Sequence, residues 1–146
     1  MTTREYLSQT FTLNRLLKAK ESRIQDLHDM KEQIGRMSTG IKVKSSQAKD
    51  PMGDVIATLL DLISEYEDDC RRLISVQEEI AALINTVRRE DYRLILFERY
   101  VNMKTWEGIA ADNYYSEKHV YKLHSAAIKL VGMIPNDTPM YDKVSA

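Results

Sequence analysis

The stretch WEGIAADNYYSEKHVYKLH, residues 106–124, decides the fold of this 146-residue chain. Two short amphipathic runs flank a break of three or four residues, and a residue type that favours helix N-caps precedes each run. Thr105 can cap a helix over 106–112, and Ser116 can cap a longer one over 117–131. The stretch therefore predicts two helices joined by a tight turn. Such a pair fits either a helix-turn-helix that reads DNA or two packed helices of an ordinary bundle.

The longer of these helices has one apolar side and one polar side. Helical spacing places on the apolar side Val120, Leu123, Ala127, Leu130 and Val131, and on the polar side Glu117, Lys118, His119, Tyr121, Lys122 and Ser125. The shorter helix is expected to turn Trp106, Ile109 and Ala110 inward, and a preceding helix over 91–102 is expected to add Leu94, Ile95, Phe97 and either Tyr100 or Val101. A third helix with polar first turns matches the docking geometry of a helix-turn-helix, although any three-helix bundle shows similar stripes.

Two long helices are predicted upstream of this module. Thr2 and Glu5 have capping-box spacing, and apolar residues then follow at helical spacing to Met37, interrupted by Lys20 and Lys31. Asp50 and Pro51 are typical of an N-cap and a first helical position. Beyond them a coiled-coil seam alternates by four and three: Met52, Ile56, Leu59, Ile63, Tyr66, Cys70, Leu73, Gln77, Ile80, Ile84 and Val87. The two helices can pair as an antiparallel hairpin or form an intermolecular coiled coil that gives a homodimer, and both can occur together.

The predicted fold is therefore all-α, with a long coiled-coil-like N-terminal hairpin followed by a three-helix helix-turn-helix module. The expected domains are the hairpin at 1–89 with a loop at 38–50, the module at 90–132 and a flexible tail at 133–146. Net charge is +2 over 1–37, +2 over 38–50, −6 over 52–87 and +1 over 88–146. The module is not broadly basic, which counts against strong unaided DNA binding because phosphate neutralisation supplies most of that affinity.

Several classes of protein are disfavoured by what the sequence lacks. One cysteine excludes an internal disulfide, and neither a signal peptide nor a membrane-spanning run is recognisable, so we expect a cytoplasmic protein without membrane contact. His119 and His124 lie about 140° apart around a helix and do not share a face as a metal pair would. No phosphate-binding glycine loop and no nucleophile beside a base is apparent. We expect no enzyme, no cofactor and no metal site.

The segment YRLILFERYVNMKTWEGIAADNYYSEKHVYKLHSAAIKLV resembles the fourth conserved region of bacterial sigma factors, which binds the promoter −35 element. It is more similar to phage-encoded sigma-like late transcription regulators of the ArpU and RinA type, including related phage proteins of unknown function. The sharp motifs lie within 91–131, and the N-terminal hairpin with its lysine-rich loop resembles the upstream half of the phage family. In the turn, where that family has leucine and then glycine or asparagine, this chain has Asn113 and then Tyr114. Either Asn113 takes the left-handed conformation or Tyr114 is strained.

The resemblance implies which residues would meet DNA. Ser116 would start the recognition helix, Val120 and Leu123 would be buried, and Tyr121 would lie near the DNA backbone. Lys104 and Thr105 could meet phosphate at the start of the supporting helix. The complete set of expected DNA-binding residues is Lys104, Thr105, Ser116, Glu117, Lys118, His119, Tyr121 and Lys122.

These observations lead to one leading hypothesis and one alternative. The leading hypothesis is a phage or prophage transcription regulator that binds promoter or operator DNA in the cytoplasm of a bacterial host, with host RNA polymerase and a second copy of the chain as further candidate partners. The alternative is a protein-interaction adaptor, a sigma mimic that docks on RNA polymerase or another protein and never reads bases. Trp106 is expected in the core, and Arg99 is expected to pair with a carboxylate such as Glu107.

Overall fold

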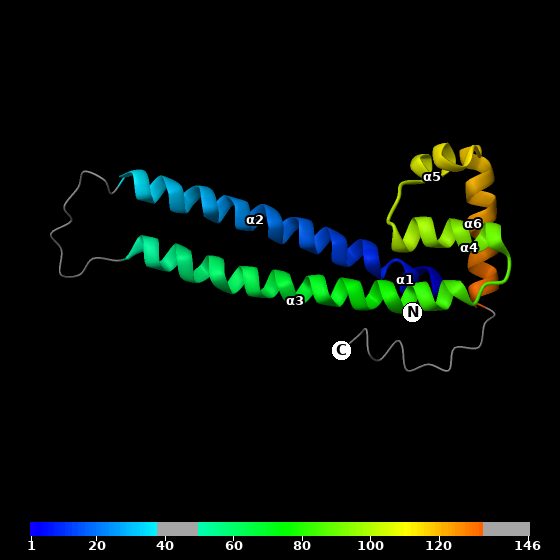
Figure 1. The fold of residues 1–146 in the computed structure, drawn as a ribbon, viewed down its shortest axis with the longest axis horizontal. Helices are drawn as coiled ribbons and strands as arrows, with labels where there is room; N and C mark the ends of the chain where they lie inside the picture. The colour runs from blue at the N-terminus through cyan, green and yellow to red at the C-terminus, as the bar shows by residue number, and fades with distance from the viewer. Residues whose placement is uncertain (38–49, 133–146) are drawn as a thin grey trace. The chain divides into compact units, whose positions relative to one another are not determined.

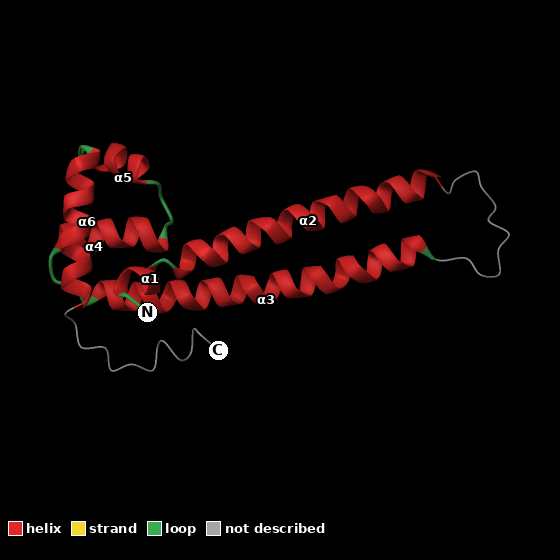
Figure 2. Ribbon diagram, turned by 180° about the vertical axis from the view of Figure 1, so that it is seen from behind, coloured by secondary structure: helices red, strands yellow, loops and turns green. Residues whose placement is uncertain are grey.

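Every regular element in the described part of the chain, residues 1–37 and 50–132, is a helix (Figures 1 and 2). The structure is a computed structural model. In chain order its elements are α1 (Thr3–Leu7), α2 (Gln9–Met37), α3 (Pro51–Asn85), α4 (Glu90–Leu96), the π-helix η1 (Phe97–Val101), α5 (Trp106–Asn113) and α6 (Glu117–Gly132). The predicted all-α class is thus confirmed over these ranges. The predicted 38–50 loop, apart from Asp50, and the 133–146 tail lie outside the described residues.

Local capping decides where the two long helical segments begin. The hydroxyl of Thr2 accepts from the backbone N–H of Glu5, and the Glu5 carboxylate accepts from the backbone N–H of Thr2, which completes the expected capping box. The Asp50 carboxylate accepts from the backbone N–H of Gly53 at 2.9 Å, so α3 begins at Pro51 as predicted. The first predicted helix is interrupted at Ser8, which separates α1 from α2.

Contacts divide the chain into two compact units. Unit 1 combines residues 1–14 with the chain from Arg72 onward, and unit 2 is Arg15–Arg71. The domain boundary predicted between residues 89 and 90 falls inside unit 1. Unit 1 joins segments that are distant in the sequence, and the side chains of Tyr6, Leu7, Ile80 and Ile84 within it are at most 1% exposed. This packing is tertiary, so helical periodicity in the sequence does not reveal it.

Within unit 2, α2 and α3 run antiparallel and bury an apolar seam (Figure 1). Lys20, which interrupts the apolar stripe of α2, contacts two carboxylates of α3, with Nζ 3.7 Å from Glu65 and hydrogen-bonded to Asp69. That hydrogen bond is the main reason that the pKa of Lys20 is raised. Residues 64–70 of α3 contain four acidic side chains, and two of them therefore contact α2 through Lys20. The seam consists of Leu27, Val55 and Leu59, flanked by Ile24, Ile34, Leu62 and Ile63.

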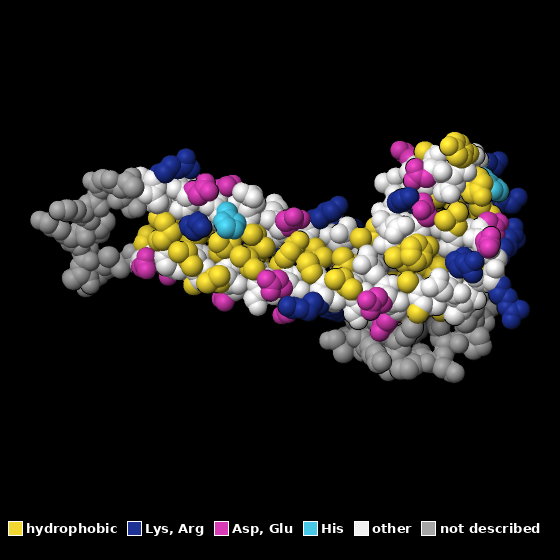
Figure 3. All heavy atoms as spheres, in the orientation of Figure 1, with side chains coloured by type: hydrophobic (Ala, Val, Ile, Leu, Met, Phe, Trp, Pro, Cys, Tyr) yellow, Lys and Arg dark blue, Asp and Glu magenta, His cyan; other side chains and the backbone are white. Residues whose placement is uncertain are grey.

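The seam of α3 differs in detail from the strict heptad. Ile56 was expected inside it, but its side chain is 38% exposed and the neighbouring Val55 is buried. A helix with 3.6 residues per turn drifts away from a 3.5-residue repeat, so one end of a long seam rotates toward solvent. Large apolar side chains remain uncovered on unit 2, and Figure 3 shows a row of hydrophobic side chains along its two helices. By exposed fraction, the uncovered large apolar side chains of unit 2 include Leu16, Met30, Ile56 and Leu60.

Unit 1 is built around α6, which packs against α4, α5 and α1. One cluster joins Ile95 of α4, Ile109 and Ala110 of α5, and Val120 and Leu123 of α6. Leu94 was expected in this core but is 40% exposed, and Leu96, at 0%, is buried instead. Leu130 is likewise 36% exposed, whereas His124 on the same helix is buried.

A π-helical turn ends the first helix of this core, with the N–H of Asn102 donating to the carbonyl of Phe97 at 3.0 Å. Such a turn leaves carbonyls near its end without helical partners. Two side chains from distant helices satisfy them. The hydroxyl of Thr10 donates to the carbonyl of Tyr100 at 2.9 Å, and the amide of Gln77 donates to the carbonyl of Val101 at 3.1 Å. Gln77, the polar position in the predicted α3 seam, therefore has a specific hydrogen-bonding role.

Candidate nucleic-acid interface

A three-residue turn connects α5 and α6, and both helices have the expected caps. The Thr105 hydroxyl accepts from the N–H of Gly108 at 3.0 Å, and the Ser116 hydroxyl accepts from the N–H of His119 at 3.1 Å. Tyr114 is left-handed, with φ 58° and ψ 33°, and its side chain is 97% exposed. The amide of Asn113 instead donates to the carbonyl of Ile109. The strained alternative for the turn is therefore the one that the chain adopts.

The exposed side of α6 carries a row of lysines. The opposite side of α6 is buried in the core of unit 1. Its side chains are each at most 6% exposed: Val120, Leu123, Ala127 and Val131. Spacings of four, three and four residues along a helix keep side chains on one face. Such spacings connect the exposed residues Lys118, Lys122, Ser125 and Lys129, which we name the lysine ridge. Figure 3 shows Lys and Arg side chains along the edge of unit 1 where α6 lies.

Lys129 was not among the expected DNA-binding residues, although its spacing from Lys122 could have identified it. The expected residues Glu117, Lys118, His119, Tyr121 and Lys122 are all exposed.

Two aromatic contacts flank the lysine ridge. The ring of His119 meets that of Tyr115 edge to face, with centroids 4.9 Å apart. On the other flank, the ring of Tyr121 lies 5.3 Å from the Trp106 indole. These contacts restrict the rotamers of two side chains that the resemblance places near DNA, which lowers the entropy lost when they meet a partner.

The two residues at the start of α5 that were predicted to contact phosphate already have partners within the chain. Nζ of Lys104 lies 2.9 Å from both Glu98 and Asp112. Hydrogen bonds to these two carboxylates, that of Asp112 first, raise the pKa of Lys104. The hydroxyl of Thr105 serves as a cap. A cation held between two anions attracts phosphate weakly, so Lys104 contributes less to a DNA surface than the lysine ridge.

Arg99 stacks between aromatic rings. Its guanidinium carbon lies 4.4 Å from the ring centroid of Phe11 and 4.3 Å from that of Trp106, and it donates to the carbonyl of Lys104 at 2.8 Å. The expected pairing with Glu107 is therefore replaced by cation–π stacking, which suits a delocalised guanidinium. Burial lowers the pKa of Arg99. Trp106 packs against the core as expected, and its indole also forms part of this stack.

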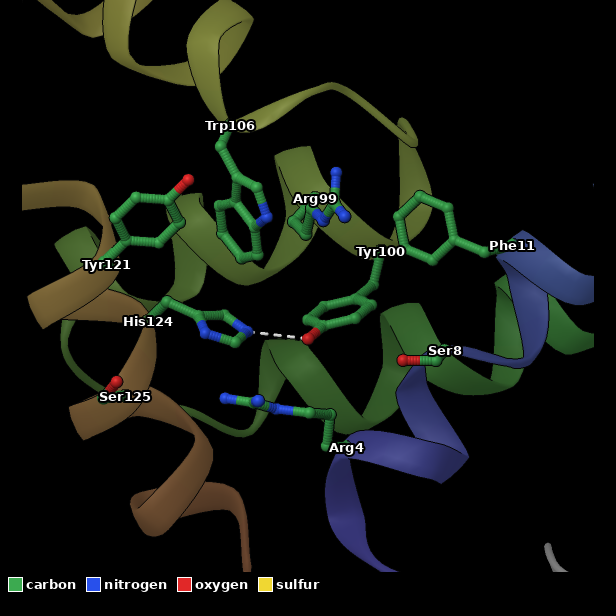
Figure 4. Close-up of a pocket in the computed structure, with 9 residues that line it drawn as sticks. All are labelled: Arg4, Ser8, Phe11, Arg99, Tyr100, Trp106, Tyr121, His124 and Ser125. Carbon is green, nitrogen blue, oxygen red and sulfur yellow. Dashed lines mark hydrogen bonds between the residues drawn. The ribbon is translucent and has the colours of Figure 1, made fainter. Parts of the chain in front are cut away.

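His124 was missed as a site residue because its partners come from other elements. Its side chain is 3% exposed, and its Nε2 shares a 2.6 Å hydrogen bond with the Tyr100 hydroxyl (Figure 4). Burial, reinforced by the nearby charges of Arg4 and Arg99, lowers the pKa of His124 to about 4. The imidazole is therefore neutral at pH 7. Its position between Val120 and Ala127 on the apolar side of α6 was the only signal in the sequence.

Comparisons with protein-family models, with curated proteins and with solved structures find no match to this chain. Among the described helices, none combines the length and the apolar character that crossing a membrane requires. The sigma-like resemblance therefore depends on the residues quoted for it.

Proposed function

We propose that the protein is a non-enzymatic transcription regulator of the phage sigma-like type, which binds promoter or operator DNA with α6 in the major groove. The main observation that supports this proposal is the lysine ridge. It lies on the exposed side of α6, a helix that follows a tight turn and whose opposite side is buried. In this arrangement α5 supports α6, which acts as the recognition helix. The N-terminal helices act as an antiparallel hairpin that presents the module and contacts partners.

The chemistry of the exposed side chains supports base reading. Lys118 and Lys122 can donate to guanine O6 and N7 or to phosphate, and Glu117, beside them in the first turn, can accept from cytosine N4. His119 can also meet a base edge, and Tyr121 can meet the DNA backbone. The aromatic contacts of His119 and Tyr121 hold both side chains beside the lysine ridge.

The affinity of one copy is expected to be modest. Three ridge lysines neutralise about three phosphates, which gives a slope of about −2.7 in a plot of log K against log salt concentration. Useful affinity therefore requires a homodimer or RNA polymerase. The uncovered apolar side chains of unit 2, such as Leu16, Met30 and Leu60, support self-association of the N-terminal helices.

Fluorescence anisotropy with a labelled random-sequence duplex, measured across salt concentrations, tests this proposal. The double variant Lys118→Ala/Lys122→Ala should reduce the magnitude of the slope by about 2, because two phosphate contacts are lost. The matched control Lys18→Ala/Arg23→Ala removes two exposed charges from α2 and should leave the slope unchanged. Equal slopes for the wild-type protein and the ridge variant would contradict the proposal.

The alternative function is a protein adaptor that docks on RNA polymerase or another protein without reading bases. Neutralisation of Lys104 by Glu98 and Asp112 favours it, because that part of the surface offers no free cation to phosphate. A pull-down from host lysate separates the two functions. An adaptor that docks without the lysine ridge keeps its partner after the Lys118→Ala/Lys122→Ala change, whereas a DNA reader loses sequence-selective binding.

A further inference from the structure

A cavity of about 330 Å³ opens in unit 1 beside α6. Figure 4 shows its lining, which comes from the N-terminal segment, η1, α5 and α6. The lining residues are Arg4, Ser8, Phe11, Arg99, Tyr100, Trp106, Tyr121, His124 and Ser125. Its volume lies at the lower end of the range of about 300–1,000 Å³ that ligand pockets occupy, which is enough for a one-ring compound.

The charge of the cavity lining is positive. Arg4 and Arg99 each bring a guanidinium, which stays protonated in proteins, and no Asp or Glu is among the lining residues that the structure describes. In Figure 4, Arg4 reaches from α1 across to the region below His124. Figure 4 shows the two guanidiniums on opposite sides of the Tyr100–His124 hydrogen bond, so an anion placed in the cavity is attracted by both positive charges.

The donors around the cavity suit a carboxylate or a phosphate. One Arg99 amino group donates to the Lys104 carbonyl, and the planar fork of the same guanidinium has further N–H groups. The hydroxyls of Ser8 and Ser125 add two small donors to the lining. Arginine binds both kinds of oxyanion through paired, charge-assisted hydrogen bonds.

Aromatic rings form the remaining walls. Phe11 and Trp106 hold Arg99 between them, and Tyr121 packs against Trp106. The Trp106 indole also meets the ring of His124 edge to face, with centroids 4.6 Å apart. Such walls favour binding of a flat apolar group. Contacts between aromatic rings stabilise the bound group in addition to the burial of its apolar surface.

We propose that this cavity binds a small organic anion, with a carboxylate or phosphate held by Arg4 and a flat, aromatic body packed against Trp106 and Tyr121. This inference does not depend on DNA reading. Because Tyr121, His124 and Ser125 belong to α6, the ligand would contact the same helix that carries the lysine ridge.

The fluorescence of Trp106 reports binding directly, because Trp106 is the only tryptophan of the chain and lines the cavity. We would titrate the full-length protein with benzoate and with phenyl phosphate, which separate the two oxyanions. Benzyl alcohol is the neutral control for the ring, and inorganic phosphate is the control for the anion. At least one aromatic anion should bind saturably with a dissociation constant of about 1 mM or tighter. Benzyl alcohol should bind about tenfold more weakly or worse.

The variant Arg4→Gln tests the role of charge without removing a buried group, because Arg4 is exposed. It should weaken binding of the aromatic anion by about tenfold or more, as expected for loss of a hydrogen bond to a charged group. The control Arg23→Gln, an exposed arginine of α2, should bind like the wild-type protein. Circular dichroism checks that both variants fold. Absence of saturation by either anion, equal affinity for benzyl alcohol, or unchanged binding by Arg4→Gln would overturn the proposal.

Discussion

His124 makes the stability of unit 1 depend on pH. Its pKa is lowered to about 4 by burial and, to a smaller extent, by Arg4 of α1 and Arg99 of η1. The unfolded chain has the ordinary histidine value of about 6.5, so it takes up a proton first as the pH falls. Protonation then favours the unfolded state. The contribution of neutral His124 to the unfolding free energy is therefore fully present above about pH 7. It is lost between about pH 6.5 and pH 4, and it does not fall further at lower pH.

The size of the effect follows from the two pKa values. Between pH 7.5 and pH 5, proton linkage removes about 2 kcal/mol of unfolding free energy. Solvent that reaches His124 through the cavity reduces this to between about 1 and 2 kcal/mol. The other charged or titratable side chains that line the cavity with the imidazole are Arg4, Arg99, Tyr100 and Tyr121.

Urea denaturation followed by Trp106 fluorescence measures this dependence in unit 1. The variant His124→Gln keeps a hydrogen-bonding group beside Tyr100 but has no proton to gain, so its loss between pH 7.5 and pH 5 should be smaller than the wild-type loss by about 1 to 2 kcal/mol. The control His119→Gln removes an exposed histidine and should behave like the wild-type protein. Equal losses for the wild-type protein and His124→Gln would refute the reasoning.

Two further predictions concern the backbone of unit 1, and urea denaturation checks both. Replacing the left-handed, exposed Tyr114 with glycine should stabilise the protein by about 0.5 to 1 kcal/mol, since relief of strain outweighs the greater freedom of the unfolded chain. A loss of stability would show that Tyr114 is not strained. Thr10→Val leaves the carbonyl of Tyr100 without its hydroxyl donor and should destabilise by about 1 to 3 kcal/mol, whereas Thr12→Val, at an exposed site, should change little. Equal effects of the two substitutions would contradict this assignment.

Features that depend on neighbouring residues could be predicted from the sequence. The caps at Thr2, Asp50, Thr105 and Ser116 each require only a hydroxyl or carboxylate beside the first turn of a helix. The polar side of α6 follows from spacing alone, and its predicted residues are exposed.

Features that depend on distant segments could not be predicted in this way. Arg99 stacks on Phe11 of α2 and on Trp106 of α5, so inspection of its own helix suggested a carboxylate partner instead. The cavity combines residues from both ends of unit 1. The left-handed turn at Tyr114 was one of two alternatives, because tyrosine rarely adopts that conformation. The packing of unit 1 as a whole determines which residue of the turn adopts the left-handed conformation.

Selection from a random DNA pool tests the central claim, base reading by α6, most directly. The purified full-length protein, used at a concentration that permits self-association, should enrich a defined duplex sequence. The variant Lys118→Ala/Lys122→Ala should lose that enrichment, at about 1–3 kcal/mol for each good base contact, while Lys18→Ala/Arg23→Ala should enrich the same sequence as the wild-type protein. Enrichment of an identical sequence by the ridge variant would contradict the claim.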